Sequence, residues 1–158
     1  MMNPLSNLIN SVSVYADMSP DLTIRFQVNQ WLQTRTRRAL SLTAWCRLFS
    51  DESNDRELLA FVYQRFSEYS GLEFGRVRPG DRLNADLHLA LVSWYDWVIT
   101  FVEDFCVHFH IDLSDRFDED NFETIGELVT FLHEQVTHSR NKTETPRLQV
   151  VASSISAA

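Results

Sequence analysis

The feature that most constrains the fold of this chain is a stripe of apolar side chains between residues 87 and 109. Its members follow one another at intervals of three or four residues: Leu87, Leu91, Trp94, Val98, Phe101, Phe105 and Phe109. This spacing keeps them on one face of an α-helix, whereas a half-buried strand would alternate apolar and polar residues. We therefore expect one continuous helix here, with a break near residues 88–93 as the alternative.

Two helices are predicted before residue 52. Ser19-Pro20 is a start signal for the first, because serine caps a helix and proline fits its first turn. The second is expected to follow Ser41. Their apolar faces consist of Ile24, Val28, Trp31 and Leu32 in the first helix and Leu42, Trp45, Cys46 and Phe49 in the second.

Two further helices are predicted to start at capping boxes, in which a side chain caps the first turn and a glutamate reaches back. The boxes are Asn54-Asp55-Arg56-Glu57 and Thr124-Ile125-Gly126-Glu127. Gly71 is expected to end the earlier helix. The inward residues are Leu58, Phe61, Val62, Phe66 and Tyr69 in one helix and Ile125, Leu128, Val129, Leu132 and Val136 in the other. Residues 72–85 and the acidic run 112–120 are predicted loops.

These elements predict an all-α fold. Four glycines and four prolines leave few tight turns, and eleven phenylalanines with four tryptophans supply a core. We expect a flexible lead-in at 1–18, a basic helical subdomain at 19–52, an acidic domain at 53–136 and a flexible tail at 137–158.

The net charge of −8 is unevenly distributed. Residues 22–50 carry five arginines and no acid, whereas residues 51–136 carry 19 acids against 6 bases. This split suggests a basic segment beside an acidic module, and the two parts are expected to pack on each other. An acidic surface repels nucleic acid and favours a protein partner with a basic surface.

No run of 18 apolar residues and no secretory signal is visible, so we expect a cytoplasmic protein without a membrane span. In that setting Cys46 and Cys106, the only cysteines, are predicted to be free thiols.

Four stretches together resemble the acyl carrier protein family. The stretches are Arg56 to Gly71, Pro79-Gly80-Asp81-Arg82-Leu83-Asn84-Ala85-Asp86-Leu87, Phe101 to Phe109 followed by Ile111-Asp112-Leu113, and Phe122 to Leu132 with its Thr124-Ile125 pair. They correspond to the first helix, the long loop, the second helix and the last helix of a carrier. The resemblance covers residues 55–136 and implies an acyl-carrier-like helical bundle with an N-terminal helical extension.

The chain departs from the carriers at the cofactor site. Carriers hold phosphopantetheine on the serine of an Asp-Ser-Leu motif, which is absent here, and Trp94-Tyr95-Asp96 stands in its place. The sequence therefore resembles divergent bacterial carrier-like proteins, and no cofactor is expected. The resemblance implies an acidic second helix that docks basic partners, with Asp96, Glu103 and Asp104 as the candidate residues.

Three hypotheses about function follow. The first is a non-catalytic carrier-like adaptor that binds a protein through the acidic helix. The second is a true acyl carrier with phosphopantetheine displaced to Ser93, whose neighbours differ from the carrier motif. The third is a small accessory or immunity-type protein that blocks a partner.

Some residues have the spacing of metal ligands or resemble a calcium-binding loop. Cys106 with His110, and His108 with Asp112, have the four-residue spacing of metal ligands, but the two pairs point in different directions. We favour a helix end whose histidines meet the negative dipole pole, and predict no metal. The acidic run 112–120 lacks the glycine of a calcium-binding loop. No catalytic motif stands out, so an enzyme is not expected.

Overall fold

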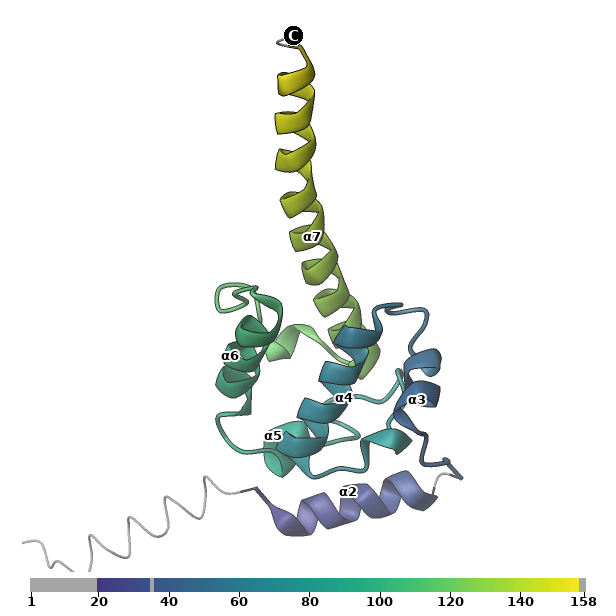
Figure 1. The fold of residues 1–158 in the computed structure, drawn as a ribbon. Helices are drawn as coiled ribbons and strands as arrows, with labels where there is room; N and C mark the ends of the chain where they lie inside the picture. The colour runs from purple at the N-terminus through teal and green to yellow at the C-terminus, as the bar shows by residue number, and fades with distance from the viewer. Residues whose placement is uncertain (1–19, 35, 157–158) are drawn as a thin grey trace, which may run out of the picture.

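The computed structural model describes residues 20–34 and 36–156, and their side chains as far as Glu144. Within these ranges the fold is all-α, as predicted, and its only extended pairing is an isolated bridge between Arg82 and Thr124. The elements are α2 (Leu22–Thr34), α3 (Leu42–Leu48), α4 (Arg56–Ser70), the 3-10 turn η1 (Phe74–Arg76), α5 (Leu89–Val92), α6 (Trp97–Phe109), the 3-10 turn η2 (Glu119–Asn121) and α7 (Ile125–Ser156). Figure 1 shows α4 in the middle of the molecule, α2 running across one end and α7 projecting from the other.

Helix α4 carries the centre of the aromatic core. The rings of Phe61 and Phe66 meet the ring of Phe101 on α6 at centroid distances of 6.0 and 5.3 Å. Helix α7 adds five buried aliphatic side chains, those of Ile125, Leu128, Val129, Leu132 and Val136. Removal of these side chains from water is the main stabilising contribution to the fold.

Helices α2 and α3 belong to the same core. Trp45 of α3 is completely buried. The centroid of its ring lies 4.1 Å from the ring centroid of Phe49 and 5.3 Å from that of Tyr63 on α4. Its Nε1 donates a hydrogen bond to the carbonyl of Val77 at 3.1 Å. The basic N-terminal segment therefore shares one hydrophobic cluster with the acidic part of the chain.

Most predicted helix ends are found, with corrections at the caps. The hydroxyl of Ser41 caps α3, and Gly71 ends α4 with a left-handed φ of 65° that suits glycine. At the start of α4 the cap is Asp55, which accepts from the amide of Leu58 at 3.2 Å. The predicted capping box around Asn54 is therefore wrong, because the carboxylate of Glu57 turns to other side chains.

The remaining two caps differ from the predictions by small shifts. Asp21 caps α2 by accepting from the amide of Ile24 at 3.0 Å, and the predicted cap Ser19 lies outside the described residues. At α7, Thr124 accepts from the amide of Glu127 as predicted. The carboxylate of Glu127 reaches back to the amide of Glu123 at 2.7 Å, one residue earlier than in a standard box.

The long apolar stripe is interrupted, so the prediction of one continuous helix is wrong and the alternative of a break is confirmed. The chain leaves α5 at Ser93 with extended backbone angles and re-enters a helix only at Trp97. At the break the carbonyls of Leu91 and Val92 bond to the N-terminal end of α2: they accept from the Asp21 amide at 2.9 Å and from the Arg25 guanidinium at 2.7 Å. Leu89, Val92 and Trp97 are buried at this point instead of Leu91 and Trp94.

Helix α7 is longer than its apolar pattern predicts. The sequence predicts a helix to about Val136, but the helical backbone continues through the polar segment to Ser156. Arg140 attaches this extension to the start of α4, where it lies 2.9 Å from Asp55 and 3.6 Å from Glu57. The predicted lead-in at 1–18 falls outside the described residues.

A buried ion pair joins the basic segment to the acidic part. The carboxylate of Asp81, only 4% exposed, accepts from two guanidinium nitrogens of Arg37 at 2.5 and 2.8 Å and from the amide of Arg78 at 2.8 Å. Arg76 and Arg78 donate in turn to the carbonyls of Arg37 and Arg38. The prediction that the two parts pack on each other is confirmed for this contact.

Candidate functional site

The three acids predicted to bind a partner do not share one surface. Asp96 and Glu103 are seven residues apart and lie near one face of α6, with Glu103 exposed and Asp96 half-buried. The carboxylate of Asp104 accepts a short hydrogen bond from the hydroxyl of Tyr69 and lies 4.0 Å from Arg65. Asp104 therefore faces α4, because one helical step turns it about 100° away from Glu103.

The contact with Asp104 changes the acidity of Tyr69. Burial of the phenol is the largest cause, and the hydrogen bond and negative charge of Asp104 add to it; together they raise the pKa of Tyr69 well above its ordinary value. The phenol therefore stays protonated and keeps donating to Asp104 throughout the neutral range. The pair fixes α4 to α6 beneath the exposed surface of α6.

We expect stability at high pH to report this contact. Because the folded state raises the pKa of Tyr69, its contribution to stability is complete below about pH 10, the ordinary pKa of tyrosine, and is lost as the pH rises further. The Tm of the wild type should therefore fall more steeply above that pH than the Tm of Tyr69→Phe, which has no hydroxyl to titrate at this position. Thermal unfolding followed by circular dichroism checks this, and parallel Tm curves for the two proteins would contradict it.

Large apolar side chains are exposed where α5 meets α6. Leu91, Trp94, Tyr95 and Ile99 are 52%, 53%, 64% and 64% exposed. We call these four residues, with Asp96 and Glu103, the docking corner. Sequence reasoning predicted the two acids but missed the apolar half, because it assigned Leu91 and Trp94 to the core. The adjacent Trp94-Tyr95 pair is the available signal, since two neighbouring aromatic residues cannot share one helix face.

The first turn of α2 lies against the docking corner. The amide of Asp21 donates to the carbonyl of Leu91 at 2.9 Å, and the guanidinium of Arg25 donates to the carbonyl of Val92 at 2.7 Å. Helix α2 also exposes Leu22 and Phe26, which are four residues apart and therefore on one face. The bond from the Asp21 amide to Leu91 places Asp21 beside the corner as a third acid.

Ser93 lies beneath the docking corner. It is buried, it follows the last residue of α5, and its hydroxyl has no hydrogen-bond partner among the described residues. A transferase that attaches phosphopantetheine needs an exposed hydroxyl at a helix start, whereas the next helix starts only at Trp97. The position of Ser93 therefore lacks both features that the displaced-carrier hypothesis requires.

The residues considered for a metal site are dispersed. His108 lies in the last turn of α6, as expected for a histidine near the negative helix pole, and its Nε2 is 3.1 Å from Glu57. His110 follows the helix end with a φ of 58°. Among the described residues there is no group of three histidine, cysteine, aspartate or glutamate side chains that could hold a metal ion.

Neither cysteine is in a disulfide bond, and two aspartates of the acidic loop bond to its backbone. Cys46 and Cys106 are free and half-buried, as predicted, and burial raises the pKa of the Cys46 thiol. In the acidic run, Asp112 and Asp118 each accept from a backbone amide two residues ahead, at 2.9 and 3.1 Å. These turns satisfy the amides of the loop between α6 and α7.

No protein-family model, curated protein or solved structure matches this chain. The resemblance of residues 55–136 to acyl carriers therefore stays a prediction drawn from their own motifs. In the part of the chain that the structure describes, no helix is both long enough and apolar enough to cross a membrane.

Proposed function

We propose that this chain is a non-catalytic adaptor whose docking corner binds a protein partner with a basic surface. The observation that carries the proposal is the exposure of four large apolar side chains within residues 91–99, beside the carboxylates of Asp96 and Glu103. Aromatic residues in the centre of a patch with charges at its rim are typical of protein interfaces. Exposed apolar clusters of this kind mark interaction sites more often than isolated side chains do.

The chemistry of the corner favours an amphipathic, basic helix as the partner segment. Leu91, Trp94 and Ile99 offer an apolar surface to leucine-like side chains. Asp21, Asp96 and Glu103 place negative charge near it, which steers and orients a segment carrying lysine or arginine. The resemblance to acyl carriers supports the same interpretation, since it implies docking of basic partners by the acidic second helix, here α6.

A synthetic peptide tests the proposal before a natural partner is known. The probe is a fluorescein-labelled helix of about five turns with leucines on one face and lysines on the other. Fluorescence anisotropy should show saturable binding to the wild-type chain. Trp94→Ala should weaken it at least about tenfold, as expected for an interface anchor, and Glu103→Lys should weaken it several-fold.

Two matched variants separate docking from general attraction to an acidic protein. Leu48→Ala removes an exposed apolar side chain on α3, and Asp115→Lys makes the same charge change as Glu103→Lys in the exposed acidic loop. Both should bind the peptide as the wild type does. If all four variants bind alike, attraction to the net charge of −8 accounts for the binding, and the proposed docking corner is wrong.

A further inference from the structure

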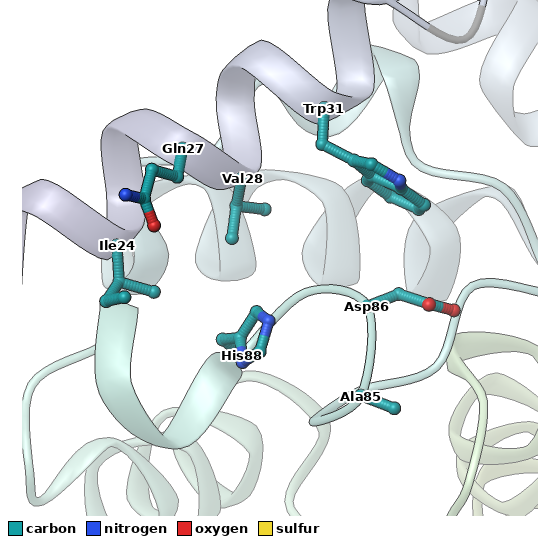
Figure 2. Close-up of a pocket in the computed structure, with 7 residues that line it drawn as sticks. All are labelled: Ile24, Gln27, Val28, Trp31, Ala85, Asp86 and His88. Carbon is teal, nitrogen blue, oxygen red and sulfur yellow. The ribbon is translucent and has the colours of Figure 1, made fainter.

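A cavity of about 190 Å³ lies between α2 and the segment that leads into α5. Figure 2 shows its walls, with α2 on one side and the turn before α5 on the other. The lining residues are Ile24, Gln27, Val28 and Trp31 from α2, and Ala85, Asp86 and His88 from the opposite side. None of them belongs to the docking corner, so the cavity is a separate feature of the molecule.

The size of the cavity limits what it can hold. An apolar protein cavity of about 150 Å³ accepts a benzene molecule, whereas pockets for drug-sized ligands start at about 300 Å³. The space beside α2 therefore suits one ring or two fused rings. Ile24 and Val28 give it an apolar wall, and Trp31 and His88 place two aromatic rings at its edge. Flat rings in the wall favour a flat ligand, because stacked or edge-on contacts need planar partners.

His88 is held in an unusual conformation at this position. Its φ of 50° is left-handed, a region that residues other than glycine seldom adopt. The surrounding backbone enforces it, because the carbonyl of His88 accepts from the amides of Leu91 and Val92, both at 2.9 Å. Figure 2 shows the imidazole directed from the turn toward α2. Within residues 20–34 and 36–144 the imidazole has no hydrogen-bond partner, so its nitrogens remain available to a ligand.

Among the residues that the structure describes, the charged groups at the edge of the cavity are paired. The carboxylate of Asp86 accepts from the backbone amide and the guanidinium of Arg82 at 2.9 to 3.2 Å. The guanidinium of Arg37, which lies 4.9 Å from the centre of the Trp31 ring, is paired with Asp81. Within residues 20–34 and 36–144, a charged ligand would therefore meet neither an unpaired acid nor an unpaired base at the edge of the cavity.

We propose that this cavity binds a small, neutral, planar heteroaromatic compound, stacked near Trp31 and hydrogen-bonded to His88. Indole is the probe, and cyclohexanol is a neutral, non-planar control. Titration of the ¹⁵N-labelled chain should give saturable shifts with indole in the signals of the Trp31 side chain and of the Ala85 and His88 amides. Cyclohexanol should cause shifts that are at least several-fold smaller at equal concentration.

Substitution of two alanines by phenylalanine shows where indole binds. Ala85→Phe places a ring over the cavity from an exposed position, and Ala90→Phe makes the same change at an exposed position on α5 that does not line it. Ala85→Phe should abolish the saturable indole shifts, and Ala90→Phe should keep them. His88→Ala should weaken binding several-fold. Absence of saturation in the wild type, persistence of the shifts in Ala85→Phe, or equal shifts with cyclohexanol would overturn the proposal.

Discussion

Trp45→Ala should lower the free energy of unfolding by about 3–5 kcal/mol, the range measured for large aromatic residues removed from protein cores. Trp45 is completely buried, its ring contacts Phe49 and Tyr63, and its Nε1 satisfies the carbonyl of Val77. The substitution creates a cavity and also leaves a buried carbonyl without its donor, which adds to the cost. Urea denaturation followed by circular dichroism measures the loss.

The matched control for this variant is Trp94→Ala. It removes the same side chain from a position that is 53% exposed, and its effect on the free energy of unfolding should stay within about 0.5 kcal/mol. Because α3 and α4 share one core, Trp45→Ala should also unfold in a single transition. A separate early transition, with most of the helical signal retained, would show that residues before 52 fold independently of α4.

Asp81→Ala should cost about 3–5 kcal/mol of stability, because it leaves the half-buried guanidinium of Arg37 without its partner. It also removes the acceptor for the amide of Arg78. By contrast, Glu68→Ala breaks an exposed pair with Arg65 on α4 and should cost at most about 1 kcal/mol. Chemical denaturation of both variants measures the difference.

A double-mutant cycle isolates the buried pair. If the penalty of Asp81→Ala comes from the unpaired charge of Arg37, then Arg37→Met should recover part of the stability in the Asp81→Ala background. Additive losses in the double variant would contradict this explanation, and they would assign the effect of Asp81 to the backbone turn around Arg78.

The sequence predicts the parts of this fold that depend on local spacing. The cap at Ser41, the left-handed end of α4 at Gly71 and the start of α7 at Thr124 all follow from residues within one helical turn. The break between α5 and α6 does not, because Asp21 and Arg25, about 70 residues earlier in the chain, bond to the carbonyls of Leu91 and Val92 there. A helical period cannot reveal contacts of that kind.

In the candidate site, too, contacts between residues far apart in the sequence are the features that the sequence does not predict. Glu103, predicted to contact a partner, lies at an exposed position of α6. Asp104 is also predicted to contact a partner, but only the folded chain reveals its bond to Tyr69, which lies 35 residues earlier. Arg37 and Asp81 are 44 residues apart, and only the folded chain identifies them as a buried pair. Leu91 and Trp94 follow the apolar period, but the break removes them from the core.

The most direct test of the docking corner is to map where the Leu/Lys peptide binds on the ¹⁵N-labelled chain. We expect the largest amide shifts within residues 91–103 and in the first turn of α2, together with a shift of the Trp94 side-chain signal. The acidic loop at 112–120, which carries more negative charge, should change little. Shifts centred on that loop or spread evenly over the acidic surface would contradict docking at the junction of α5 and α6.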